Sequence, residues 1–282
     1  MQEHISYTQI NMVFTCGIRY DFRYRKGIKI PPSGAMVLGG NGHKTLEKNF
    51  SQKIKSGKDL PLTELTDHFS DLWKSEKYNI VFSEDELAGS SPAKTLGKFK
   101  DRGIASIETF YNPTTLPVKS QKPKPAKINA IKRDLWHGIG TINPIASEER
   151  FDIVFEGHNP QLMGFIDRID SGNEIAEVKF TAKTPPAGDA NRDMQLSIYD
   201  LAHRVKYGRP PSLLKKQWIV AGKKVVEQTA PPRDDETMER LMSKIELAMR
   251  AIKTGVFVPA TPGSWQCSRK WCGYWSQCLY KS

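Results

Sequence analysis

Two apolar segments separated by a short turn carry the charges that most constrain the fold. The first, residues 164–167, ends on Asp167, and the second places Glu177 and Lys179 two positions apart. Because side chains on a strand alternate between its two faces, Glu177 and Lys179 project from one face. A tight return between the segments would bring Asp167 beside them. Two carboxylates and a lysine so arranged can bind a divalent cation and position a water for phosphodiester hydrolysis.

Hydropathy periodicity and turn residues predict the elements around these two strands. We expect helices and strands, in chain order, over residues 35–50 (helix), 62–111 (helical), 151–155, 162–169 and 174–180 (strands), 189–207 (helix), 213–220 with 224–228 (a hairpin) and 233–253 (helix). Residues 112–127 hold four prolines among lysines and predict an exposed connector. This order predicts one mixed α/β domain over residues 1–282, with a helical insertion and connector at residues 51–150.

The formal net charge of +11 and the sequence pI near 9.4 favour a polyanionic partner. We expect nucleic acid and no membrane, because no apolar run approaches the roughly 20 residues that span a bilayer. The N-terminus lacks the pattern of a secretory signal, which predicts an intracellular, cytoplasmic protein. The basic and aromatic segment 19–29 could grip phosphates and stack on unpaired bases, or it could bury Tyr20 and Tyr24 beneath its charges.

Four cysteines stand near the two ends of the chain: Cys16, Cys267, Cys272 and Cys278. Three of them fall within twelve positions, which in an intracellular protein indicates a metal rather than disulfides. Four thiolates suit a [4Fe-4S] cluster or a tetrahedral Zn²⁺, and the alternative is a set of free, buried thiols.

Taken together, these residues resemble the PD-(D/E)xK nuclease superfamily, and within it the RecB-like branch with its phage exonucleases and CRISPR-associated nucleases. The resemblance covers most of the chain except about residues 51–150. The matching positions are Gly39, His43, Leu46 and Glu47 in the upstream helix, Asp167 in the first strand, Glu177-Val178-Lys179 in the second, and Gln195 with Tyr199 four residues later in the next helix.

The resemblance implies a restriction-endonuclease-like core, in which helices flank a central mixed sheet. It implies that Mg²⁺ or Mn²⁺ is held by His43, Asp167, Glu177 and the backbone carbonyl of Val178. The catalytic set that it implies is Asp167, Glu177, Lys179, Gln195 and Tyr199. The imidazole would shift the preference towards manganese. Lys179 would orient the attacking water and stabilise charge on the phosphate, while Gln195 and Tyr199, one helical turn apart, would hold the substrate strand or the lysine.

The resemblance also implies a clasp, formed by residues 260–282 together with Cys16, which joins the chain ends around an iron-sulfur cluster. Two departures bear on this expectation. Gly17 stands where the family's Cys-Pro-x-x-Tyr has proline, and four residues separate Cys267 from Cys272 where family members commonly have two. Zinc therefore stays the alternative to [4Fe-4S].

The function that we expect is a metal-dependent DNA exonuclease of a phage or bacterium, in the host cytoplasm if phage-encoded. It would act on DNA ends or single strands in recombination, repair or end processing, with a helicase or recombinase partner. The alternatives are a DNA-end-binding or assembly subunit that does not cut, and an RNase on the same fold; oligomeric state stays open. We expect Asp170 and Glu174 to be turn and strand-edge acids, and Glu148 and Glu149 to solvate a loop, with support of the metal as the alternative.

Overall fold

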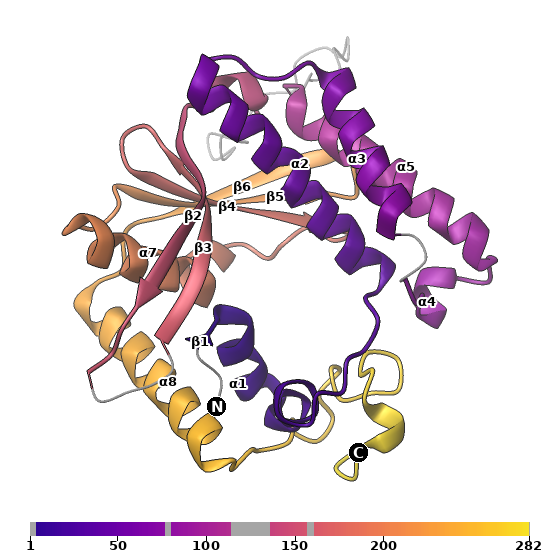
Figure 1. The fold of residues 1–282 in the computed structure, drawn as a ribbon, viewed down its shortest axis with the longest axis vertical. Coiled ribbons are helices and arrows are strands. Elements are labelled where there is room, and N and C mark those ends of the chain that lie inside the picture. Colours follow the sequence, from indigo (N-terminus) through magenta and orange to yellow (C-terminus); the bar gives the residue numbers. More distant parts are fainter. Residues whose placement is uncertain (1–3, 77–79, 114–135, 157–160, 282) are drawn as a thin grey trace, which may run out of the picture.

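The structure, a computed structural model, describes residues 4–76, 80–113, 136–156 and 161–281 (Figure 1). The connector predicted over residues 112–127 lies outside them from residue 114 onwards. The described chain forms one six-stranded mixed sheet. Its path is β1 (His4–Ile5), β3 (Gln161–Asp170), β4 (Glu174–Thr181), β5 (Leu213–Val220) and β6 (Lys224–Ala230), with β2 (Pro144–Ile153) paired to β3 off this path. β1 pairs with β3, and β4 with β5, in parallel; the other pairs are antiparallel.

Helices cover both faces of the sheet, which confirms the predicted fold class. One face carries α1 (Tyr7–Tyr20), α7 (Met194–Tyr207) and α8 (Asp235–Thr254), and the other carries α2 (Gly34–Ser56), α3 (Leu62–Glu76) and α5 (Pro92–Tyr111). The short elements are η1 (Asp21–Arg25), α4 (Glu84–Leu87), η3 (Ile139–Thr141), α6 (Asp189–Arg192) and η4 (Trp275–Gln277).

Alternation along β4 and β5 produces the two cores. Ile175 and Leu214 pack with α7 and α8, whereas Val178 and Ile219, an odd number of residues further along, pack with α2, α3 and α5. Because β4 is buried on both faces, any charged side chain on it must find partners within the fold. The helices between residues 62 and 111 share the second core, while the status of residues 51–150 as an insertion stays a prediction.

Three predicted boundaries were wrong. β2 begins at Pro144, not at residue 151. The segment before residue 151 is too polar to show strand alternation, but pairing with β3 holds it in the sheet. The helix predicted over residues 189–207 is broken at Asp193, whose extended backbone lets its carboxylate cap α7 through the Leu196 N–H at 2.8 Å. The helix predicted over residues 35–50 continues to Ser56 as α2, whereas the stretch predicted to be helical over residues 62–111 begins and ends as predicted and comprises α3, α4 and α5.

Candidate active site

β3 and β4 stop pairing directly at the predicted acids. The last paired residues towards this end are Arg168 and Ala176. One position further, the carboxylate of Asp167 takes the place of a main-chain acceptor, because its Oδ2 accepts the Val178 N–H at 3.1 Å. Beyond Arg168 and Ala176 the backbones of β3 and β4 no longer pair directly. The hydrogen bond from the Val178 N–H holds the Asp167 side chain in place there.

Asp167 receives two further contacts, from helices on opposite faces of the sheet. The Tyr199 hydroxyl of α7 donates to Oδ1 at 3.0 Å. The His43 Nδ1 of α2 lies 3.4 Å from Oδ2. Burial raises the pKa of Asp167, an effect that Lys179 and the Val178 hydrogen bond oppose. Sequence reasoning predicted this grouping of His43, Asp167 and Tyr199, and the structure brings the three side chains together.

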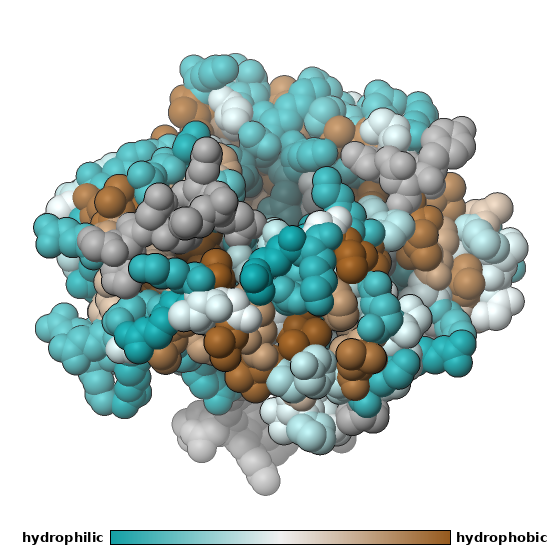
Figure 2. Space-filling view, turned by 60° about the horizontal axis from the view of Figure 1, so that its bottom comes forward, coloured by the Kyte–Doolittle hydropathy of each residue, from teal (hydrophilic) through white to brown (hydrophobic). Residues whose placement is uncertain are grey.

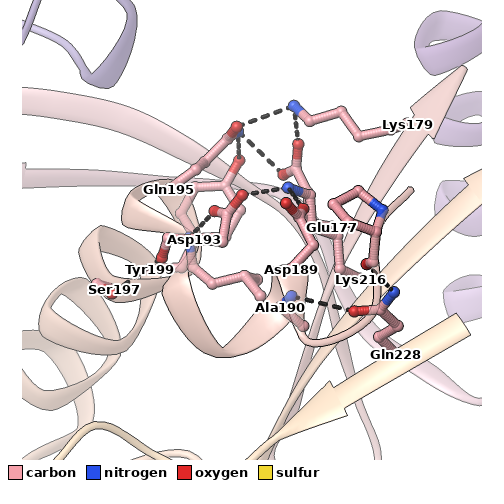
Figure 3. A network of polar contacts seen from close by, with 12 residues as sticks. Glu177, Lys179, Asp189, Ala190, Asp193, Gln195, Ser197, Tyr199, Lys216 and Gln228 are labelled. Carbon is pink, nitrogen blue, oxygen red and sulfur yellow. Dashed lines mark hydrogen bonds and ion pairs between the residues drawn. The ribbon is translucent and has the colours of Figure 1, made fainter. Parts of the chain in front are cut away.

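Glu177, Lys179, Gln195 and Tyr199 form one connected network, drawn in Figure 3. Glu177 is fully buried, pairs with Lys179, and accepts from the Gln195 amide at 3.0 Å. The Gln195 side-chain oxygen accepts from Lys179 at 2.9 Å. The Gln195 amide nitrogen also donates to the Tyr199 hydroxyl at 2.8 Å. Gln195 thus ties both β4 charges to α7. Burial lowers the pKa of Lys179, but the ion pair with Glu177 outweighs this effect and the net shift is upward.

Lys216 fixes the start of α7 against the sheet, next to this network (Figure 3). The buried ammonium of Lys216, on β5, pairs with Asp193 and, at 3.0 Å, with Asp189. Asp193 is also the cap of α7. One carboxylate therefore couples β5 to the helix that presents Gln195 two residues later, which explains why Gln195 can reach Glu177.

The site contains an acid that sequence reasoning had assigned to a loop. Glu148 lies in β2, and its neighbours Ser147 and Glu149 pair with Arg168 and Ile166, so that Glu148 stands opposite Asp167. One ligand atom each from His43, Glu148 and Asp167 lie within 4.8 Å of one another. Glu148 also has a positive φ of 48°, which is rare for a residue with a side chain and often marks a functional position.

Crowding of acids leaves this site short of positive charge. Burial, and then Asp167, raise the pKa of Glu148 to about 8. Burial and Asp167 likewise raise the pKa of Glu177 to about 7. His43 offers little compensation, because burial lowers its pKa, although Glu177 and a backbone hydrogen bond with Val178 act in the opposite direction. Three acids facing one lysine form a site that a divalent cation would neutralise.

The metal set predicted from the sequence differs in part from the trio in the structure. The structure places the Val178 backbone beside His43, as expected. The Glu177 carboxylate faces Lys179 and Gln195 instead of joining the trio, whereas Glu148 takes part in it. The signal that could have found Glu148 is the alternation of Phe151, Ile153 and Phe155, which begins three residues later; extending that strand backwards would have included Glu148.

The remaining predicted acids have structural partners. Asp170 is buried and binds the Arg168 guanidinium through both oxygens, at 2.7 and 3.1 Å, so it is not a simple turn acid. Glu174 pairs with Lys215, and Glu149 with Lys206.

The four cysteines converge from both ends of the chain. Cys16, Cys267, Cys272 and Cys278 all line one cavity, and none forms a disulfide. Burial raises the pKa of Cys272, and the nearby thiols of Cys16 and Cys278 add to this effect. Figure 1 shows the yellow C-terminal tail, which carries three of the cysteines, beside the chain that follows α1.

Gly17 has a role that proline could not perform. Its N–H donates to the Val258 carbonyl at 2.8 Å, and a Cβ at this position would lie 2.9 Å from the Phe257 Cβ. Cys16 itself has non-helical angles (φ −165°, ψ 98°), so α1 is kinked where the clasp attaches. The departure from the Cys-Pro pattern thus coincides with a direct bond between the N-terminal helix and the chain that leads into the tail.

The aromatic side chains of the basic segment 19–29 are mostly inside the fold. Tyr20 is buried, and Phe22 stacks on Tyr274 with 5.3 Å between ring centroids. Tyr24 contacts Tyr20 at 5.0 Å. Of the two interpretations left open by the sequence, the structure favours the one in which these rings pack and the charges remain outside.

The model of the PD-(D/E)XK nuclease superfamily matches residues 4–279. No curated protein matches the sequence. Among solved structures, a “putative exonuclease” from Eubacterium rectale is 10% identical, with 94% of this chain and 86% of that chain covered and a TM-score of 0.47. SSO0001 is 20% identical over 49% of this chain and 60% of that chain, with a TM-score of 0.34. Both TM-scores are too low to support a function.

Within the described residues, no helix combines the length and the apolar character needed to cross a bilayer.

Proposed function

The chain belongs to the PD-(D/E)XK nuclease superfamily, whose members hydrolyse phosphodiester bonds of nucleic acid, and we propose that it is a metal-dependent DNA exonuclease. The observation that carries the proposal is the convergence of five elements on one acidic centre. The contributors are His43 from α2, Glu148 from β2, Asp167 from β3, Glu177 and Lys179 from β4, and Gln195 and Tyr199 from α7.

The donor set fits a hard divalent cation. Members of the superfamily typically use Mg²⁺ or Mn²⁺. The trio of His43, Glu148 and Asp167 would supply one imidazole and two carboxylates, and an imidazole is a better ligand for Mn²⁺ than for Mg²⁺. The Val178 carbonyl, on the adjoining strand, would add a backbone ligand, while Glu177 holds Lys179 and Gln195 beside the cation. When bound, the cation supplies charge neutralisation at the phosphate and lowers the pKa of a water.

Lys179 is the group that we assign to the attacking water and to the phosphate. Its ammonium is held by Glu177 and Gln195, and its net pKa shift is upward, so it remains charged at neutral pH. A fixed ammonium can orient a water and stabilise the negative charge that develops during in-line attack. Tyr199 orients Asp167, and Gln195 orients Lys179, so both α7 residues act by positioning.

A cleavage assay on end-labelled linear DNA with Mn²⁺ or Mg²⁺ tests the proposal. Asp167→Asn and Glu148→Gln should each abolish cleavage, because each removes a charged ligand from the trio. Glu149→Gln is the matched control, since Glu149 is the next residue of β2 but pairs with Lys206 outside the trio. Wild-type protein that leaves DNA intact, or equal activity in Glu148→Gln and Glu149→Gln, would overturn the proposal.

The choice of substrate decides between the proposal and its alternatives. Closed circular DNA should survive if ends are required, and a matched RNA strand should survive if the enzyme reads deoxyribose. Preferential RNA cleavage would establish an RNase on this fold. Tight binding of DNA ends without cleavage would indicate an assembly subunit. We place the activity in recombination, repair or end processing inside the cell, where a helicase or recombinase would supply or use the DNA end.

We propose that the clasp holds a structural [4Fe-4S] cluster, with Zn²⁺ as the alternative. Four thiols that line one cavity, together with the absence of any acid or imidazole among its lining residues, support a group with an affinity for sulfur. The cluster would tie Cys16 to the tail. Protein purified anaerobically should be brown with broad absorption in the blue, and should contain about four irons per chain. Colourless protein with one bound zinc would contradict the cluster assignment.

A further inference from the structure

Two segments of the chain contain basic residues and no acid. Residues 22–46 and 247–282 contain ten lysines and arginines and no aspartate or glutamate, although the chain has 31 acids. The first segment includes η1 and the start of α2, and the second includes the tail of the clasp. The two meet where a Cβ on Gly273 would lie 2.7 Å from Ile30. Two segments far apart in sequence therefore lie side by side. Three of their cations are paired with acids just outside them, Arg25 and Lys26 with Asp21 and Arg250 with Glu246.

Aromatic side chains are exposed on the tail, in contrast to those of η1. Trp265 is 65% exposed and Trp271 is 52% exposed. Their rings meet edge to face, with 5.5 Å between centroids. Lys270 lies 5.5 Å from the centroid of the Trp271 ring, and Arg269 is exposed beside it. Figure 2 brings the lower side of the fold forward, where brown hydrophobic residues lie among teal ones; tryptophan is pale on this scale, so the brown residues are other side chains.

An indole that remains open to water is costly unless a partner covers it. The Trp271 ring already contacts the Lys270 ammonium. Its edge-to-face contact with Trp265 leaves part of both indole rings exposed. A flat exposed ring flanked by cations, on a tail whose own sequence has no acid, suits a ligand that has both π-faces and regularly spaced negative charge. Unpaired nucleic acid is such a ligand, because its bases stack and its phosphates pair with basic side chains.

We propose that the exposed face of the clasp is a platform for single-stranded nucleic acid, in which Trp265 and Trp271 stack on unpaired bases while Arg269 and Lys270 contact phosphates. The proposal rests on the proposed function in one respect, namely that the substrate is nucleic acid. It assigns a second contact outside the active site, and it replaces the aromatic role that the sequence suggested for residues 19–29.

The platform is connected to the active site by one rigid helix. Ile30 packs on Gly273 of the clasp, and α2 begins four residues later, at Gly34. His43 lies nine residues into α2, which corresponds to about 13 Å along the helix axis. α2 therefore leads from the neighbourhood of the clasp to one member of the acidic trio. The platform would retain the strand between successive cuts.

The test measures binding in EDTA, so that cleavage does not enter. The affinity of the cofactor-loaded protein for a labelled oligothymidylate, followed by fluorescence anisotropy, should fall about 30-fold or more in Trp265→Ala/Trp271→Ala, because each of the two bases loses a stacking contribution of about 1–3 kcal/mol. Trp265→Phe/Trp271→Phe should retain most of the affinity. Leu279→Ala is the matched control, since Leu279 is a 93% exposed apolar residue of the same tail without a ring to stack. Oligouridylate in parallel shows whether the platform distinguishes RNA from DNA.

Hydrolysis of bis(p-nitrophenyl) phosphate, which is too small to reach both sites, should be the same in wild type and in the double alanine variant. A wild type that does not hydrolyse this ester counts against the proposed function and leaves the binding result to stand. Unchanged oligothymidylate affinity in the double alanine variant overturns the platform. So does an equal loss in Leu279→Ala or in the phenylalanine variant, which would indicate a non-stacking surface or a damaged clasp. Tryptophan-dependent binding to anionic vesicles or self-association, without effect on the oligonucleotide, would assign the surface to a membrane or to a second copy.

Discussion

The active site and the clasp both join the N-terminal part of the chain to its C-terminal half, but they do so with opposite chemistry. The active site gathers acids, among them the fully buried Glu177, around one lysine. The clasp gathers thiols, and the tail that carries it has no acid after Glu246. A chain with a net charge of +11 therefore contains a local cluster of acids at its active site. A polyanion is attracted to the periphery and a cation to the centre, which is the separation that metal-assisted phosphodiester hydrolysis requires.

The largest expected effect separates activity from stability at the acidic centre. Glu177→Gln should lower the cleavage rate by about 10³-fold or more, because an amide leaves Lys179 without its anionic partner. The thermal midpoint should change little, since the substitution also removes a buried like-charge neighbour of Asp167. Steady-state cleavage and a thermal melt on the same preparation measure both quantities. A large loss of thermal stability would show that this pair holds the fold rather than the chemistry.

The clasp should behave in the opposite way, with stability affected first. Cys278→Ser removes one of four thiol ligands, and we expect a loss of several kcal/mol in unfolding free energy, because metal binding in such sites is coupled to folding. Limited proteolysis should then cut the tail, and bound metal per chain should fall. A variant that binds less metal yet melts like the wild type would mean that packing alone, such as Phe22 on Tyr274, closes the clasp.

The pH dependence of stability should reveal the acids of the active site. In the metal-free protein Glu148 and Glu177 have pKa values of about 8 and 7, above their usual value near 4.5. The folded state therefore holds protons that the unfolded state has released, so these groups stabilise fully below pH 4.5 and lose that contribution as the pH rises through 7 and 8. Mn²⁺ binds the deprotonated acids, and its stabilising effect should grow over the same range.

Melting temperatures measured in EDTA and in Mn²⁺ between pH 5.5 and 9 check this prediction. We expect the EDTA series to fall by several degrees more in the wild type than in Glu148→Gln. Identical pH curves for the two proteins would mean that Glu148 is not crowded by its neighbours.

How much of this site the sequence could predict depends on the range of the interaction. Strand alternation placed Glu177 and Lys179 on one face, and helical spacing placed Gln195 and Tyr199 together, because both depend on neighbours within four residues. The fold class followed from the order of such local patterns. The sequence did not place Glu148 in the site, because its position opposite Asp167 is fixed by pairing with a strand about 20 residues away. The segment that contains Glu148 is too polar to show strand alternation.

The same limit explains the aromatic residues. Residues 19–29 and the tail of the clasp are both rich in basic and aromatic residues, yet Tyr20 is buried and Trp265 is exposed. Which ring is covered depends on Phe257 and Tyr274, which lie more than 200 residues away. No periodicity within either segment encodes that choice.

The smallest effect compares two glycines, one at each region. A Cβ on Gly42 would lie 2.3 Å from the Phe180 ring, so Gly42→Ala must push α2, and His43 with it, away from β4. A Cβ on Gly17 would instead lie 2.9 Å from the Phe257 Cβ and 3.1 Å from the Val258 backbone. We expect each substitution to cost about 1–3 kcal/mol of stability. Only Gly42→Ala should also raise the Mn²⁺ concentration needed for half-maximal cleavage, and the smaller Phe180→Leu should partly restore it, because a branched side chain can yield space where a ring cannot. An equal loss of Mn²⁺ binding in Gly17→Ala and Gly42→Ala would contradict this prediction. It would show that a displacement at the clasp also moves His43, so that the two regions are structurally coupled.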